Sequence, residues 1–177
     1  MGSTANGEPD GSVPVVRSVP DFSSFYRREY RAVTTLTMVL TRSHSAAEDI
    51  AQDAFLRAQR DWERVGQFDN PEGWVRRVAT NLAISRFRSM RAEAKALLRM
   101  RPVRSATTMS VEASEFWADV RRLPGRQAQV VALHYVEDRT VEDIAGILGI
   151  TTGSVKTHLH RARETLAKRF GTMEEAP

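Results

Sequence analysis

The sequence predicts an all-α protein of two small helical domains joined by a flexible linker, with a helix-turn-helix in the C-terminal domain. Apolar residues recur every three or four positions through most of the chain, as on one face of a helix, and no stretch alternates as a strand does. Only ten Gly and seven Pro interrupt the 177 residues. The periodicity fails over 98–112, where Pro102 and small polar residues predict the linker.

The other boundaries follow from the same patterns. Residues 1–20 are rich in Gly, Ser, Pro and Val without a period, and we expect them to form a disordered tail. The helical domains are expected over 21–97 and 113–171, with a second tail over 172–177. The chain length suits two small domains.

The N-terminal domain is predicted to contain three helices, the first of which starts at Phe22. Ser45 can begin the second, because its hydroxyl can accept a hydrogen bond from the amide of Glu48 while the Glu48 side chain reaches back. The third helix is expected to start at Asn70, which suits the N-cap, and to continue into the basic stretch described below.

Asn81 interrupts the apolar face of this third helix. Asn and Asp compete with the helix for backbone hydrogen bonds, so they favour caps and turns. We therefore expect Asn81 to cap a break in the helix.

The C-terminal domain is predicted to hold two longer helices separated by the LPG turn at 123–125, and then a pair of helices joined by a tight turn. Thr140, supported by Asp143, can cap the first helix of the pair. Gly149 can end it in a left-handed conformation, and Thr151 can cap the next. Two helices joined in this way form a helix-turn-helix.

The last helix has two opposite faces. Its inward stripe is apolar and consists of Val155, Leu159, Ala162 and Leu166. The other side suits the major groove of DNA, where Arg and Lys reach guanine edges and phosphates. We call it the duplex-reading face; it consists of Ser154, Lys156, Thr157, His160 and Arg161. The alternative is an ordinary helical hairpin with a solvated basic face.

The net charge of +4 is modest, so the placement of the charges matters more than their sum. Residues 86–104 contain seven Arg or Lys residues against one acidic residue, and residues 153–170 contain five against one. Two basic stretches far apart in sequence suggest two contacts with a polyanion, although either stretch alone is more simply a solvated surface.

Several classes of function are disfavoured. Without Cys, the chain has no disulfide or thiolate chemistry, which fits a cytoplasmic protein. No apolar run approaches the ~20 residues of a membrane span, and no secretion signal is recognisable. His158 and His160 point about 200° apart on a helix and cannot share a metal. With no carboxylate pair, nucleophile elbow or phosphate loop, we expect no enzyme activity, metal or cofactor.

Three motifs occur in a fixed order: AAEDIAQDAFLRAQRDW, NPEGWVRRVATNLAISRFRSMR, and the segment from LPGRQAQVV to RARETL. On these motifs, over 22–170, the chain resembles an extracytoplasmic-function (ECF) sigma factor, the smallest class of bacterial RNA polymerase specificity subunits. NPEGWVRRVATNLA, with FYRREY upstream, resembles the actinobacterial group typified by SigE.

The resemblance implies that the first motif grips the coiled coil of the largest polymerase subunit, that the second melts the promoter and reads the −10 strand, and that the third reads the −35 duplex. We therefore expect a cytoplasmic alternative sigma factor that binds polymerase core and promoter DNA. An anti-sigma protein is a further partner that the family implies, and the sequence identifies none.

The resemblance also assigns residues on the third helix. We call them the strand-reading face; they are Trp74, Arg77, Asn81 and Arg88. Arg binds phosphate, and an amide reads the edge of an exposed base. A Trp on an apolar stripe is more often part of the core. The expected break at Asn81 would form a base-reading loop.

On the second helix, polar residues with one Leu follow at i, i+3, i+4 and i+7. This set, which we call the docking strip, consists of Asp49, Gln52, Asp53 and Leu56. Such a strip suits docking on a partner helix, which the resemblance identifies as the polymerase coiled coil. A solvated acidic face is the alternative.

Two departures from the family pattern stand out. RSHS at 42–45 replaces a common GD and affects a loop, and Ser85 stands where Asp is common, which bears on −10 preference.

A stand-alone repressor is the main alternative to a sigma factor. The N-terminal half argues against it, because it shows neither the βα alternation of a receiver domain nor the long heptads of a coiled-coil dimer interface. One good bidentate contact discriminates by only ~1–3 kcal/mol, so we expect the free protein to bind promoter DNA weakly.

Overall fold

The structure, a computed structural model, describes residues 21–97 and 111–174. Within these ranges every regular element is an α-helix, as predicted. The N-terminal domain contains α1 (Phe22–Thr41), α2 (His44–Arg60), α3 (Trp62–Val65) and α4 (Pro71–Leu97). The C-terminal domain contains α5 (Val111–Val120), α6 (Gly125–Val136), α7 (Val141–Leu148) and α8 (Thr152–Glu174).

The expected tail over 1–20 lies outside the described residues, as does most of the expected linker. Helix α5 begins at Val111, so the last two residues of the expected linker belong to a helix. Helix α8 runs to Glu174, into the range expected as a C-terminal tail.

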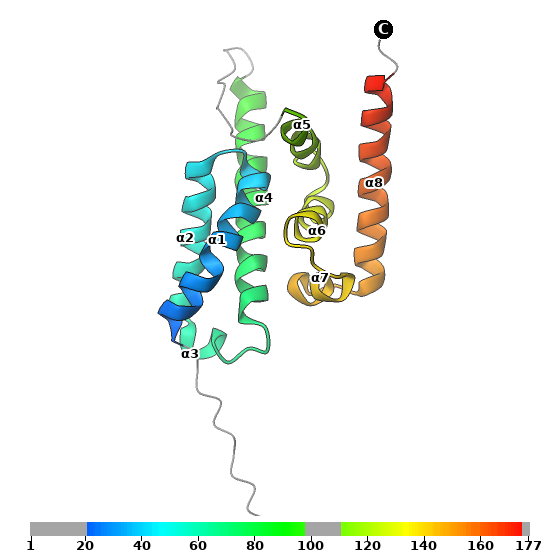
Figure 1. Ribbon diagram of the computed structural model, residues 1–177. Helices are drawn as coiled ribbons and strands as arrows, with labels where there is room; N and C mark the ends of the chain where they lie inside the picture. Colours follow the sequence, from blue (N-terminus) through cyan, green and yellow to red (C-terminus); the bar gives the residue numbers. More distant parts are fainter. Residues whose placement is uncertain (1–20, 98–110, 175–177) are drawn as a thin grey trace, which may run out of the picture.

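Helices α1, α2 and α4 pack together as a bundle, which places the docking strip and the strand-reading face on separate helices (Figure 1). Its core is apolar and includes Phe25, Val33, Leu36, Phe55 and Val75, each at most 2% exposed. Aromatic rings of α1 and α2 meet edge to face in this core, as Phe25 and Phe55 do with ring centroids 6.0 Å apart.

The start of α2 differs from the prediction. Ser43, rather than Ser45, is the N-cap, and its hydroxyl oxygen accepts a hydrogen bond from the amide of Ala46. Arg42 ends α1 in the left-handed conformation (φ 63°), so the extended residue that follows is the one placed to cap. The capping box predicted for Ser45 and Glu48 is therefore wrong.

Other predicted helix ends are confirmed. Asn70 accepts a hydrogen bond from the amide of Gly73 at the start of α4. Thr140 and Asp143 form a reciprocal capping box on α7. Gly149 ends α7 with φ 64°, a conformation that costs glycine little because it has no Cβ.

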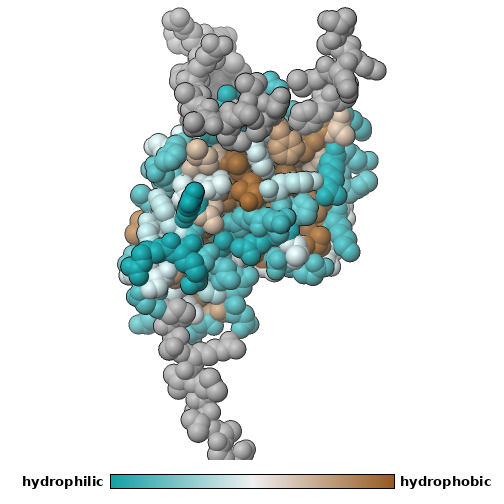
Figure 2. All heavy atoms as spheres, viewed as in Figure 1, coloured by the Kyte–Doolittle hydropathy of each residue, from teal (hydrophilic) through white to brown (hydrophobic). Residues whose placement is uncertain are grey.

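The two domains lie against each other. Helices α6 and α7 sit between α4 on one side and α8 on the other, and α6 also contacts α1 (Figure 1). The surface in this view is largely hydrophilic, with hydrophobic side chains gathered toward the end where α4 and α5 lie (Figure 2). Among the described residues, none of the helices is long and apolar enough to cross a membrane.

Candidate functional site

The helix-turn-helix places α8 with one face buried and the other open. The amide of Ile150 donates to the carbonyl oxygen of Ala145 at 3.1 Å, which closes the turn at Gly149. Thr151 then caps α8, because its hydroxyl oxygen accepts from the amide of Ser154 at 3.1 Å. The whole inward stripe predicted for α8 is buried, with Val155, Leu159, Ala162 and Leu166 between 0% and 6% exposed.

Opposite this stripe, the duplex-reading face is accessible. Lys156, Thr157, His160 and Arg161 are exposed and Ser154 is half-buried. The Thr157 hydroxyl donates to the carbonyl oxygen of Gly153, and Nε2 of His160 lies 3.6 Å from a carboxylate oxygen of Glu164. The exposed cations and hydroxyl groups thus lie together on one side of a helix that has no packing role there.

The docking strip on α2 is also largely open. Asp49, Gln52 and Leu56 are exposed and Asp53 is half-buried. Two of its carboxylates take part in ion pairs: Asp53 with Arg57 at 3.1 Å, and Asp49 with Arg86 of α4 at 3.5 Å. Leu56 is 51% exposed, which makes it one of the few large apolar side chains of the described residues left in water.

The strand-reading face is exposed at Arg77, Asn81 and Arg88, and these side chains also reach the C-terminal domain. Nη1 of Arg77 lies against Gly149 of the helix-turn-helix, 2.8 Å from where a Cβ would stand. Oδ1 of Asn81 accepts a hydrogen bond from Nε2 of Gln129 at 2.7 Å, and Nη2 of Arg88 lies beside Gly125. Three of the four predicted residues therefore contact the C-terminal domain.

The remaining predictions on α4 have two outcomes. Trp74 is half-buried and packs against the hydrophobic core. The predicted break at Asn81 is wrong, because α4 runs unbroken from Pro71 to Leu97. The side chain of Asn81 pairs with Gln129 across the domain boundary instead of with its own backbone, so nothing there competes with the helix.

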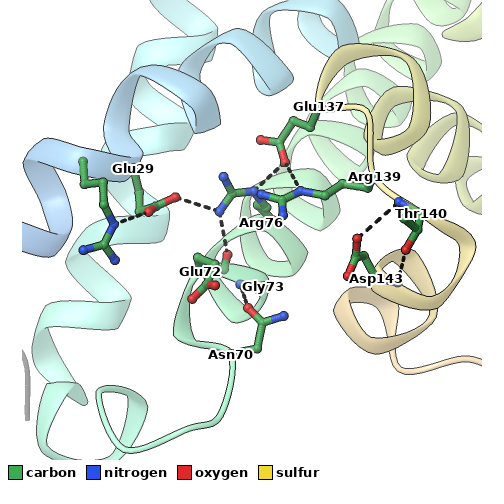
Figure 3. Close-up of polar contacts among 10 residues, drawn as sticks. Glu29, Asn70, Glu72, Gly73, Arg76, Glu137, Arg139, Thr140 and Asp143 are labelled. Atoms are coloured by element: carbon green, nitrogen blue, oxygen red, sulfur yellow. Dashed lines mark hydrogen bonds and ion pairs between the residues drawn. The ribbon is translucent and has the colours of Figure 1, made fainter.

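A buried charge cluster joins the domains next to this face. Arg76, 2% exposed, donates through Nε to Glu137 after α6, and through Nη1 to Glu29 of α1 at 3.0 Å (Figure 3). Arg139 also reaches Glu137, at 3.2 Å. Burial by itself would lower the pKa of Arg76, but the charges of Glu137 and Glu29 outweigh it and raise that pKa.

Glu29 sits at the other end of this cluster. Burial raises the pKa of its carboxyl, but hydrogen bonds from Arg28 and Arg76 more than offset this, so the pKa is lowered. Glu137 bonds through one carboxylate oxygen, while its Oε1 is buried without a partner. The cluster is thus strongly charged, but one of its buried carboxylate oxygens accepts no hydrogen bond.

A second junction lies at the opposite end of the interface. Nη1 of Arg121, at the end of α5, donates to the carbonyl oxygen of Val39 near the end of α1 at 2.8 Å. Within 21–97 and 111–174, the residues that the structure describes, no carboxylate forms an ion pair with this buried guanidinium. Burial, together with the positive charges of Arg42 and Arg122, lowers the pKa of Arg121 to about 10.

Sequence reasoning missed Arg76, Gln129 and Glu137. One signal was available: Arg76 follows Val75 and precedes Ala79 on the buried side of α4, so its helical phase marks it as inward-facing. Nothing in the local pattern identifies its partner 61 positions away.

Among the residues that the structure describes, no group of three His, Asp or Glu could hold a metal ion.

Comparison with known families fits this geometry. The Sigma-70 region 2 model matches residues 25–93, which contain the docking strip and the strand-reading face. The Sigma-70 region 4 model matches residues 118–166, which contain the duplex-reading face.

Curated relatives agree. The ECF RNA polymerase sigma factor SigW of Bacillus subtilis is 31% identical, over 70% of this chain and 75% of SigW. The ECF sigma factor SigM of Mycobacterium tuberculosis is 29% identical, over 85% and 77%. A probable RNA polymerase sigma factor of Xanthomonas campestris, RfaY, is 32% identical over 79% of this chain, which spans only 39% of that relative.

The fold is also found in a solved structure. The sigma factor RpoE of Bartonella quintana, in complex with the anti-sigma factor NepR, aligns with a TM-score of 0.64 and 22% identity, over 84% of this chain and 95% of that one. The resemblance inferred from the motifs is confirmed, including the resemblance to the actinobacterial group. The RNA polymerase sigma-E factor of Streptomyces coelicolor is 27% identical, over 85% of this chain and 89% of its own length. The chain belongs to the ECF RNA polymerase sigma factors, which direct promoter-specific initiation of transcription.

Proposed function

We propose that this sigma factor reads the −35 duplex with the duplex-reading face of α8 and the melted −10 strand with the strand-reading face of α4. The docking strip of α2 binds the coiled coil of the largest polymerase subunit. The observation that carries the proposal is the open basic face of α8 opposite a fully buried stripe, within a region 4 sequence. A groove-binding helix needs this combination.

The protein acts through binding alone. We propose that it has no catalytic activity, needs no cofactor, and works in the bacterial cytoplasm beside the polymerase. An anti-sigma protein is the class of regulator that would cover these surfaces.

The function is tested by run-off transcription on genomic fragments with sigma-free core polymerase. We expect RNA chains with defined start points only when the protein is added. If no defined transcript forms, the proposal is wrong. Co-purification with core polymerase separates it from a stand-alone repressor, which would bind DNA without the enzyme.

The docking strip can be tested without DNA. Replacement of Leu56 by Ala should weaken binding to core polymerase, because it removes the large apolar side chain of the strip from the proposed interface. Met90 is 55% exposed on α4, outside the strip, so Met90→Ala is a matched control that should bind core normally. Equal affinities for both variants would argue against the strip.

A further inference from the structure

We propose that two adjoining cavities between α4 and the α5–α6 segment form a binding site for a small diphosphate-bearing ligand such as a nucleotide. We call them the arginine cavities. Their volumes are about 240 and 250 Å³, and Ile84, Arg88 and Gly125 line both of them. Sites for small molecules usually have volumes of ~300–1,000 Å³, so the two cavities together have the size of such a site. The inference goes beyond promoter reading and does not depend on it.

The walls of the arginine cavities are strongly basic. Among the described residues, no Asp or Glu lines them, whereas four arginines do: Arg88, Arg121, Arg122 and Arg126. Arg122 forms an ion pair with Asp119 at 2.8 Å. The other three arginines form no ion pair with a carboxylate in the part of the chain that the structure describes. Like charges around one space repel one another, and a bound anion would remove that repulsion.

Arg121 is the most deeply buried of these cations, at 7% exposed. Its Nη1 donates to the carbonyl oxygen of Val39 at 2.8 Å, which is a neutral acceptor. The pKa of Arg121 is lowered by burial and by the positive charges of Arg42 and Arg122. Buried charges in proteins are normally paired, because an unpaired one is costly. An anion in the adjoining cavity would supply the missing charge.

The start of α6 adds a second source of positive potential. Pro124 is the N-cap of this helix and offers no side-chain hydrogen bond, so the first amides lack the usual side-chain acceptor. Gly125, the first residue of α6, lines both cavities, and Nη2 of Arg88 lies 2.8 Å from where its Cβ would stand. A guanidinium against the positive end of a helix is unfavourable, and an anion beside both would stabilise the pair.

The charge and shape of the cavities indicate the class of ligand. A phosphate group carries about −1.5 to −2 at neutral pH, so a diphosphate balances several guanidinium groups better than a single phosphate does. Asn81 and Ser85 line the first cavity, and their amide and hydroxyl groups can hydrogen-bond to a base or a sugar. Arg121 and Leu123 line the second cavity and are buried, so this cavity is a recess. A DNA strand follows an open groove, whereas a recess favours a small ligand.

Titration of the full chain with inorganic diphosphate at physiological ionic strength tests the site by calorimetry. We expect one diphosphate per chain, bound at least about tenfold more tightly than inorganic phosphate, because the second phosphate adds at least one hydrogen bond between charged groups. ADP should compete with diphosphate for the same site. An absence of saturable binding, or equal affinities for phosphate and diphosphate, would overturn the proposal.

A matched pair of variants at Ser85 adds or withholds a carboxylate in the first cavity. Ser85 is exposed on α4, so a longer side chain fits there. Ser85→Glu supplies an internal counter-charge and should weaken diphosphate binding at least about tenfold, whereas the neutral Ser85→Gln should stay within about threefold of wild type. The thermal midpoint of Ser85→Glu should not fall, which separates lost binding from unfolding. If the two variants bind diphosphate equally well, the cavities are not the site.

A second pair separates the cavities from the general charge of the surface. Arg126 and Arg60 are both exposed, but only Arg126 lines a cavity. Arg126→Ala should weaken diphosphate binding about tenfold, and Arg60→Ala should leave it unchanged. Equal losses would mean attraction to surface charge alone and would refute the site. If diphosphate and ADP do not bind, while a single-stranded DNA 12-mer loses affinity in Arg126→Ala, the cavities hold a strand and the small-ligand proposal is wrong.

Discussion

The two surfaces that we propose read DNA carry similar chemistry but differ in their contacts with the rest of the chain. The duplex-reading face of α8 lies in water, whereas three of the four residues of the strand-reading face of α4 contact the other domain. The duplex-reading face was identified from helical spacing together with its Arg, Lys and hydroxyl side chains, whereas the strand-reading face was assigned from the resemblance to ECF sigma factors. The comparison teaches that sequence reasoning can nominate a face without saying which other part of the folded chain it contacts.

The largest effect that would break this comparison is expected on the duplex-reading face. Replacement of Arg161 by Ala should weaken −35 duplex binding by the holoenzyme by ~1–3 kcal/mol, about 5–150-fold, if Arg161 contacts a base edge. Arg163→Ala makes the same change in charge, but Arg163 bonds to the hydroxyl of Tyr135 at 3.0 Å and points away. Fluorescence anisotropy on promoter duplex measures both, and equal losses would mean that α8 contributes only general charge.

The next effect concerns Gly149, where the two faces meet. An Ala at φ 64° costs ~1–2 kcal/mol, and its Cβ would also meet Arg77 of the strand-reading face at 2.8 Å. We expect a lower midpoint of thermal unfolding. Gly146 in α7 is the matched control, because nothing lies within 4 Å of its Cβ position. Gly146→Ala should stabilise by ~0.5–1 kcal/mol, and a similar loss at both positions would contradict the turn.

A smaller effect is expected at the cap of α7. Thr140→Ala removes the hydroxyl that accepts from the amide of Asp143 at 3.1 Å and should cost ~1 kcal/mol in urea unfolding. Thr35 is an exposed threonine inside α1, and Thr35→Ala should cost nothing. If both variants unfold in a single urea transition, the interface between the domains couples their unfolding. If each variant shows two transitions, the two domains unfold separately.

The smallest effect should appear on acidification. The pKa of Glu29 is lowered from its ordinary value of 4.5, so its contribution to stability is present above that value and is lost as the pH falls through the lowered pKa. When the pH is lowered from neutral to below 4.5, the free energy of unfolding should therefore fall less in Glu29→Gln than in wild type. Parallel pH profiles of unfolding free energy for the two proteins would show that the Arg76 cluster adds no acid sensitivity.

Much of the fold could be predicted because its determinants are local. The capping box at Thr140, the turn at Gly149 and the buried stripe of α8 each depend on residues a few positions apart. The hydrogen bond of Asn81 across the domain boundary depends on Gln129, 48 positions away, and neither spacing nor composition encodes that pairing. The break predicted at Asn81 failed for the same reason, since the amide found a distant partner.

The buried guanidinium of Arg121 has a consequence of its own. Its hydrogen bond to the carbonyl oxygen of Val39 sets one neutral acceptor against the cost of removing a full charge from water. A neutral side chain of similar length, such as Met, would avoid that cost and lose one hydrogen bond. The contact between the two domains is therefore less stable than the same backbone permits, and a single substitution at Arg121 should improve it.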